Sequence, residues 1–230
     1  MSAQEFLNLY KELEEDLDRY FEAKGRRSQS PIYDYMNSKE GQVYKETLDV
    51  CREIRNLLSH HADVDGQSVV EPAAGLLEDL KEVINYVNHP PLAIDASTMV
   101  DRLLITDETR NVYDLMQIMD KRGFSHIPVV KSGRVTGVFS VSTIFAWQLA
   151  NPEETLDMTK TVGDLVPYLS FSKHRIEQFG FAGRDLTVLE AREALEKKQR
   201  GKRVSAIFLT DNGEESGKLL AMVTPYDVIG

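Results

Sequence analysis

The spacing of apolar residues divides this chain into a helical first part and a mixed second part. Over residues 1–90 apolar residues recur three and four positions apart, which is typical of amphipathic helices. After residue 90 they also form short unbroken runs, which are typical of buried strands. The sequence therefore predicts an α+β protein, with an α-helical bundle over residues 1–90 and a mixed region over residues 91–230.

The first predicted helix starts at Ser2, because Ser2 and Glu5 form a capping-box pattern, and it extends to about Gly25. Its apolar residues alternate spacings of four and three: Phe6, Tyr10, Leu13, Leu17 and Tyr20. Such a narrow seam packs either inside its own bundle or against the same helix of a second chain. We expect the chain to form a homodimer.

Two further helices complete the predicted bundle. One begins at Ser38 and reaches His60 or His61, with a buried stripe of Val43, Val50, Ile54, Leu57 and Leu58. The other opens at Glu71 and Pro72 and buries Leu76, Leu77, Leu80, Val83, Ile84 and Val87. Pro90 and Pro91 end it, since proline cannot continue a helix, and they mark the predicted domain boundary.

The mixed region contains one pattern twice, which indicates an internal duplication. The first copy, about 92–150, has a helix over 111–122, a strand over 125–130, a turn, a strand over 135–140 and a helix from 141. The second copy, about 158–230, has a helix over 187–199, a strand over 203–209, a turn, a strand over 218–223 and a helix from 225. Each copy is too small to close a core alone, so we expect the two to pack together.

The last strand runs directly into a helix start. Thr224 is a good N-cap, Pro225 suits the first helical position, and Asp227 lies where the helix dipole favours a carboxylate. In the first copy Ser140 stands in the place of Thr224 and Thr143 in that of Asp227.

These residues resemble the cystathionine-β-synthase-type (CBS) domain pair, a pseudo-two-fold arrangement also called a Bateman module. The resemblance rests on residues 126–130, 137–140 and 221–227 and covers roughly 92–230. It implies a regulatory sensor that binds an adenine nucleotide, namely AMP, ATP or cyclic di-adenosine monophosphate, without a metal ion. In such a sensor the helical bundle passes the ligand signal to a protein partner or to a second copy of the chain.

The resemblance also implies a set of ligand contacts. Asp227 is expected to accept hydrogen bonds from the ribose hydroxyls, and Thr224 to approach the phosphate or the ribose, with Pro225 and Tyr226 between them. The remaining candidates are the backbone of Ser205 and Ala206 for the adenine edge, Ile207 and Met222 for its face, Lys202 and Arg203 for the phosphates, and Ser140 and His126. Two structural alternatives stay open: Thr224 to Asp227 is also a capped helix start that needs no ligand, and His126 is also a partly buried strand residue.

The helical part carries a second, shorter resemblance. Ile54 to His60 is similar to the HEPN superfamily motif, in which an Arg, a polar residue and a following His from two protomers cleave RNA without metal. It implies Arg55, Asn56 and His60 as catalytic residues, since Arg stabilises a charged phosphate species and His moves protons near neutral pH. Three interpretations remain: a solvated helix face, a HEPN-like fold without activity, or a ribonuclease that is controlled by nucleotide binding to the CBS pair.

Charge and composition narrow the function classes. The formal net charge is −10, and residues 1–90 hold 18 acidic and 10 basic residues, a balance of −8, which disfavours general nucleic-acid binding. Five of the seven residues from Lys197 to Arg203 are cationic, which suits a small phosphorylated ligand. A single Cys51 and the absence of an apolar run of 18 residues predict a cytoplasmic protein that does not span a membrane. No P-loop, Gly-x-Gly-x-x-Gly or metal-spaced Cys or His cluster is present in the sequence.

Overall fold

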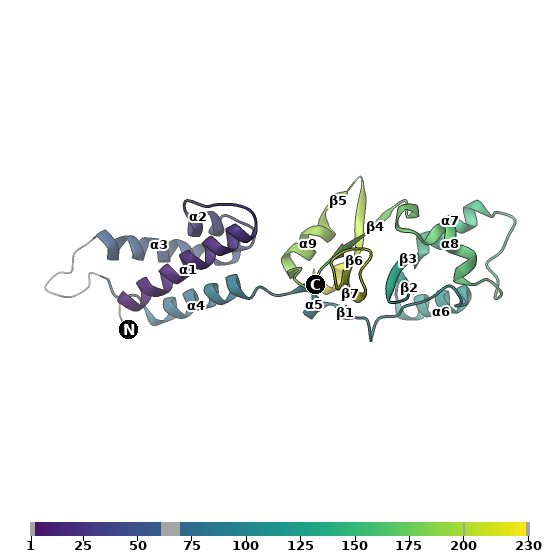
Figure 1. The fold of residues 1–230 in the computed structure, drawn as a ribbon, viewed down its shortest axis with the longest axis horizontal. Helices are drawn as coiled ribbons and strands as arrows, with labels where there is room; N and C mark the ends of the chain where they lie inside the picture. The colour runs from purple at the N-terminus through teal and green to yellow at the C-terminus, as the bar shows by residue number, and fades with distance from the viewer. Residues whose placement is uncertain (1–2, 61–69, 200, 229–230) are drawn as a thin grey trace. The chain divides into compact units, whose positions relative to one another are not determined.

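The chain divides into two compact units, Met1–Pro91 and Leu92–Gly230 (Figure 1). The computed structural model describes residues 3–60, 70–199 and 201–228. The first unit is helical and the second mixes helices with strands, which confirms the predicted α+β fold. Within the described ranges, no helix has both the length and the hydropathy that a membrane span requires.

The first unit is a bundle in which α1 (Ala3–Ala23) packs against α4 (Ala74–Asn88) and α3 (Lys45–His60). A short helix α2 (Pro31–Met36) and a 3-10 turn η1 (Gly41–Tyr44) connect α1 to α3. The predicted seam of α1 faces this bundle, because Phe6, Tyr10, Leu13 and Leu17 are all buried in its core. The predicted cap at Ser2 lies outside the described residues.

The prediction of which residues of η1 and α3 are buried is partly wrong. Val43, Val50 and Leu57 are exposed, with 78%, 45% and 41% of their surface accessible, whereas Leu48 and Cys51 are buried. The chain forms α2 and η1 before α3 begins at Lys45, so the side facing α1 and α4 lies about a quarter turn away from the predicted stripe. Ile54 and Leu58 still pack against the core from its edge.

The second unit holds all the strands of the described chain. The larger sheet has the strand order β1 (Thr98–Met99), β7 (Leu219–Val223), β6 (Lys202–Thr210) and β4 (Glu177–Ala182). A short strand, β5 (Lys198–Gln199), also pairs with β6. The smaller sheet consists of β2 (His126–Lys131) and β3 (Arg134–Ser140). Its helices are α5 (Ala93–Ala96), α6 (Val112–Arg122), α7 (Val141–Ala150), α8 (Val166–Leu169), α9 (Val188–Glu196) and α10 (Pro225–Val228), with 3-10 turns η2 (Val162–Leu165) and η3 (Phe171–Lys173).

The predicted duplication is present in the second unit. The order α6, β2, β3, α7 repeats as α9, β6, β7, α10, and in each copy the two central strands pair antiparallel. Each copy also receives a parallel neighbour on its first central strand: Thr106 bridges to Val129 in one copy, and β4 pairs with β6 in the other. The two copies therefore share one topology.

The segments that lead into each copy are exchanged between the copies. Leu92, before α5, bridges to Thr187, the N-cap of α9 in the second copy. Thr161, before η2, bridges to Asn111, the N-cap of α6 in the first copy. Each lead-in thus belongs to the copy that follows it in sequence and packs on the other, so neither copy has a complete core alone.

An apolar layer joins the two copies. Val138 of β3, Phe208 of β6 and Met222 of β7 are buried in the same cluster. Phe171, Phe179 and Phe181 surround Phe208 with ring centroids 5.6–6.2 Å from it. A fully buried phenylalanine contributes about 1.5–3 kcal/mol, so this layer is a main source of the stability of the pair.

We predict that Gly137→Ala destabilises the second unit by about 1–3 kcal/mol. A Cβ at Gly137 would lie 2.6 Å from the carbonyl oxygen of Leu169, a backbone atom that cannot move alone. The matched control is Gly180→Ala in the same unit, whose Cβ would lie 3.5 Å from Ile207, an ordinary contact. Denaturant unfolding followed by the fluorescence of Trp147, the only tryptophan and a core residue of this unit, measures both variants. Equal stability of the two variants would contradict the prediction.

Candidate functional site

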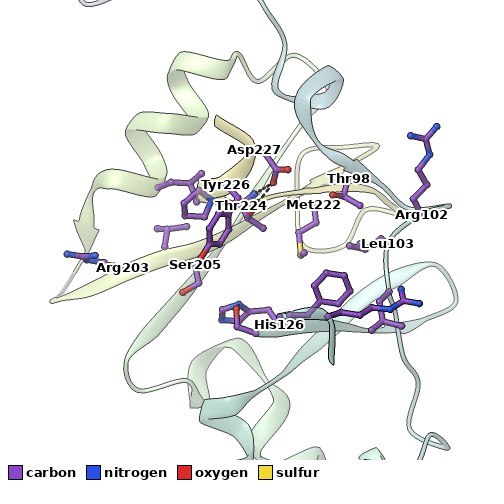
Figure 2. Close-up of a pocket in the computed structure, with 18 of the residues that line it drawn as sticks. Thr98, Arg102, Leu103, His126, Arg203, Ser205, Met222, Thr224, Tyr226 and Asp227 are labelled. Carbon is purple, nitrogen blue, oxygen red and sulfur yellow. Dashed lines mark hydrogen bonds between the residues drawn. The ribbon is translucent and has the colours of Figure 1, made fainter. Parts of the chain in front are cut away.

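A cavity of about 810 Å³ lies between the two copies of the second unit (Figure 2). Small-molecule sites are commonly about 300–1,000 Å³, so the cavity has the size for one. The first copy and its lead-in contribute Thr98, Arg102, Leu103, Leu104, Arg122, Gly123, Phe124, Ser125 and His126. The second copy contributes Leu195, Glu196, Lys198, Arg203, Val204, Ser205, Met222, Thr224, Pro225, Tyr226 and Asp227.

The helix start predicted from the sequence forms one wall of this cavity. Asp227 Oδ2 accepts hydrogen bonds from the backbone N–H of Thr224 at 2.6 Å and from its Oγ1 at 2.7 Å. Figure 2 shows this pair of bonds above the opening. Among the described residues, Asp227 Oδ1 makes no hydrogen bond. One carboxylate oxygen therefore caps the helix while the other remains for a ligand donor.

The first residues of strand β6 form the second wall of the cavity. Only some of the β6 residues that were predicted to contact the ligand line it. Ser205 and Arg203 line the cavity, but Ala206 and Ile207 are buried in the sheet with 0% and 3% exposure. Lys202 also does not line it, because its Nζ donates a hydrogen bond of 2.5 Å to the carbonyl oxygen of His174. Successive side chains of a strand point to opposite faces, which separates Lys202 from Arg203.

The charge of the cavity wall is predominantly positive. Among the described lining residues, Arg102, Arg122, Lys198 and Arg203 are cationic, and Glu196 and Asp227 are acidic. All four cations are exposed, so their charges are free to meet an anion from solvent. Figure 2 shows Arg102 and Arg203 at opposite ends of the opening. In the part of the chain that the structure describes, no three His, Cys, Asp or Glu side chains are grouped to hold a metal ion.

Several lining residues were missed by the sequence analysis. Thr98 pairs with Met222 and lies on β1. This strand has two residues, too few to show an alternation of apolar and polar positions in the sequence. Phe124 and Ser125 follow Gly123, the left-handed C-cap of α6 with φ of 68°. The duplication could have indicated Phe124 and Ser125, since they correspond to Val204 and Ser205 in the second copy.

Ser140, the predicted counterpart of Thr224, does not line the cavity. It is 1% exposed, and its Oγ donates a hydrogen bond of 2.8 Å to Glu177 Oε1. The same carboxylate oxygen accepts a short hydrogen bond from Ser142 Oγ and contacts His174 Nδ1 at 2.8 Å. Ser140 is therefore engaged with a residue of β4 that the sequence analysis did not single out.

His126 links this polar cluster to the cavity. Its ring lines the cavity wall, with Nε2 2.7 Å from Glu177 Oε2 and Nδ1 2.8 Å from Ser125 Oγ. Burial by itself raises the pKa of the Glu177 carboxyl. The hydrogen bonds from His126, His174, Ser142 and Ser140 outweigh burial and hold that pKa well below its usual range. Glu177 is thus an ionised, almost fully hydrogen-bonded carboxylate inside the unit.

The three residues of the HEPN-like motif lie on α3 in the first unit. Arg55 is half-buried, with its guanidinium 5.9 Å from the ring centroid of Tyr10 and Nη1 3.5 Å from Asn56 Oδ1. The side chain of His60 lies outside the described residues. The predicted catalytic trio therefore stays a prediction.

The comparisons with known proteins identify part of the second unit. The family model of the CBS domain matches residues 81–150, which confirms a CBS domain in the predicted first copy, about 92–150. The match starts within α4 and does not extend to the HEPN-like motif. No curated protein matches the chain.

Solved structures show a weaker similarity to the chain. CBSX2 in complex with AMP is similar at 20% identity over 60% of this chain and 93% of that chain, with a TM-score of 0.42. CBSX2 from Arabidopsis thaliana gives 17% identity, 60% and 92% coverage and a TM-score of 0.42. A putative acetoin utilization protein (AcuB) from Vibrio cholerae gives 13% identity, 60% and 87% coverage and 0.45. Similarity at this level says nothing about the ligand of this chain.

We predict that Glu177→Gln lowers the stability of the second unit by about 1.5–3 kcal/mol at pH 7, because charge-assisted hydrogen bonds are lost. The depressed pKa of Glu177 means that its contribution is present above about pH 4.3, the usual pKa of glutamate, and is lost as the pH falls toward the folded-state value. The difference between wild type and variant should therefore shrink from pH 5 to pH 2.

Trp147 fluorescence in denaturant at several pH values measures this difference. Glu153→Gln, at an exposed position of the same unit, is the control and should show no such trend. A difference between wild type and Glu177→Gln that stays constant down to pH 3 would rule out an ionised, hydrogen-bonded Glu177.

Proposed function

We propose that the cavity between the two copies binds an adenine nucleotide and that the chain is a nucleotide-responsive regulatory protein. The observation that supports this most is the combination, in one cavity, of a capped helix start with a free carboxylate oxygen, apolar walls and an excess of cations. The match of residues 81–150 to the CBS domain model supports the same function.

Each part of a nucleotide has a matching group in this cavity. The ribose hydroxyls would donate to Asp227 Oδ1, the oxygen that the helix cap leaves available. The base would lie among Leu195, Val204 and Met222, which supply an apolar surface. The phosphates would meet Arg203 or Arg102 at the two ends of the opening.

The segment that enters the second unit gives the ligand a route to the helical unit. Leu92 is anchored on the N-cap of α9, and β1 pairs with β7, so the segment is fixed to the second copy. Thr98, Arg102 and Leu103 of this segment line the cavity. A ligand that contacts them acts on the stretch of chain that continues from α4, and we propose that this stretch carries the signal.

We predict that Asp227→Ala weakens binding of AMP about 10- to 100-fold in isothermal titration calorimetry, equivalent to about 1.5–3 kcal/mol for a lost charge-assisted hydrogen bond. ATP and cyclic di-adenosine monophosphate serve as the other probes. Because the substitution also removes a helix cap, it needs a control that loses only a cap.

Asp164→Ala supplies that control. Asp164 Oδ2 caps η2 through the N–H of Thr161 at 2.7 Å and its Oγ1 at 3.1 Å, in the same geometry as Asp227 but away from the cavity lining. We expect Asp164→Ala to keep wild-type affinity. Equal affinities of wild type and Asp227→Ala, or absence of binding of all three nucleotides by wild type, would overturn the proposed function.

A second prediction separates two neighbouring cations. Arg203→Met should lower ATP affinity about tenfold at low salt and reduce the dependence of affinity on salt, because Arg203 lines the cavity. Lys202→Met should leave ATP affinity within about threefold of wild type, because Lys202 bonds the carbonyl of His174 instead. Calorimetry at two salt concentrations measures both variants. The reverse order of effects would place the phosphates elsewhere.

A further inference from the structure

The duplication gives the cavity a counterpart in the first copy. Ser140 precedes α7 as Thr224 precedes α10, and Thr143 and Asp227 are the third residues of these helices. In each pair the side chain of the third residue accepts a hydrogen bond from the backbone N–H of the preceding Ser or Thr. The strands that lead to them correspond as well, because β3 pairs with β2 as β7 pairs with β6. A ligand site at the start of α10 therefore has an equivalent position at the start of α7.

That equivalent position is filled by the carboxylate of Glu177. Oε1 accepts from Ser140 and Ser142 in the first turn of α7 and contacts His174 Nδ1, while Oε2 contacts His126 Nε2. Glu177, Ser140 and His174 are 9%, 1% and 2% exposed. The positive end of a helix favours a negative group at this place, and here the chain supplies the negative group itself.

The position of Glu177 is fixed from several directions. β4 begins with Glu177, which lies beside Arg203 in the parallel pairing with β6. His174 Nε2 lies 3.2 Å from the carbonyl oxygen of Leu169, so both of its ring nitrogens lie within hydrogen-bonding distance of oxygen atoms. Lys202 holds the backbone of His174 through its carbonyl. Among the described residues, no buried side-chain nitrogen or oxygen lacks a hydrogen-bond partner.

A phosphorylated ligand would face a filled and negatively charged place at α7. It would have to displace a carboxylate that four side chains bind, and it would then meet like charge. The start of α10 also carries a carboxylate, but it is not filled, because Asp227 uses one oxygen for its own cap and the cavity beside it is open. The two copies are therefore equivalent in fold but not in their capacity to take an anion.

We propose that Glu177 is a built-in anion that closes the counterpart site, so that each chain binds one ligand molecule and not two. The number of ligands rests on the proposed function, whereas the closure of the α7 position by Glu177 does not. Removal of the side chain in Glu177→Ala would uncover an anion-binding place formed by Ser140, Ser142, His126 and His174.

Two measurements test this proposal. Calorimetry of wild type with AMP should give one molecule per chain, and two per chain would overturn the proposal while leaving the proposed function intact. Inorganic phosphate at about 20 mM should raise the melting temperature of Glu177→Ala by about 3 °C more than that of wild type, as expected for a ligand of millimolar affinity. Glu177→Gln, which fills the same space without charge, should respond as wild type does.

The phosphate measurement distinguishes a failure of the proposed nucleotide binding from a failure of the proposed closure by Glu177. If wild type binds no AMP, the proposed function fails and the phosphate response of Glu177→Ala alone decides whether Glu177 closes an anion site. A phosphate response of Glu177→Ala equal to that of wild type would overturn the closure. If Glu177→Ala does not fold, a crystal structure of wild type grown in phosphate decides: an anion bound at the start of α7 refutes the proposal, and the Glu177 carboxylate alone at that place supports it.

Discussion

The exchange of lead-in segments between the two copies is the constraint on which the second unit depends. Leu92 is bonded at the helix start of the second copy and Thr161 at that of the first, so each copy completes the core of the other. The apolar layer around Phe208 then holds the two sets of strands together. The cavity lies between the copies where this apolar layer ends, and residues of both copies therefore line it.

Within this shared framework, the placement of two carboxylates makes the copies different. Asp227 belongs to the helix start that it caps, and one of its oxygens remains available toward the cavity. Glu177 comes from another strand; its Oε1 accepts hydrogen bonds at the start of α7, and its Oε2 contacts His126 of β2. The same fold thus has an open cavity beside one helix start and an internal carboxylate at the other. His126 contacts Glu177 and also lines the cavity, so this residue borders both places.

Local patterns in the sequence predicted the parts of the structure that local forces decide. The helix start at Thr224 and the spacing of apolar residues predicted most helices and strands of the duplication, and Thr224 and Asp227 line the cavity. Glu177 was not predicted, because the parallel pairing of β4 with β6 joins segments that are distant in sequence. The exposure of Val50 had a similar cause, since the neighbours of a helix, and not its own pattern, decide which side is buried.

Binding energy at Asp227 alone cannot change the state of the helical unit, since a ligand shifts an equilibrium only through contacts that differ between the two states. The walls of the cavity are not equivalent in this respect. Thr224 and Asp227 belong to a helix start that is bonded within itself, whereas Thr98 and Arg102 lie on the segment that continues from α4. A ligand that reaches across the cavity to both walls would fix the distance between β7 and that segment. Under the proposed function, the residues of the entering segment, more than those of the helix start, are therefore where binding would be converted into a signal.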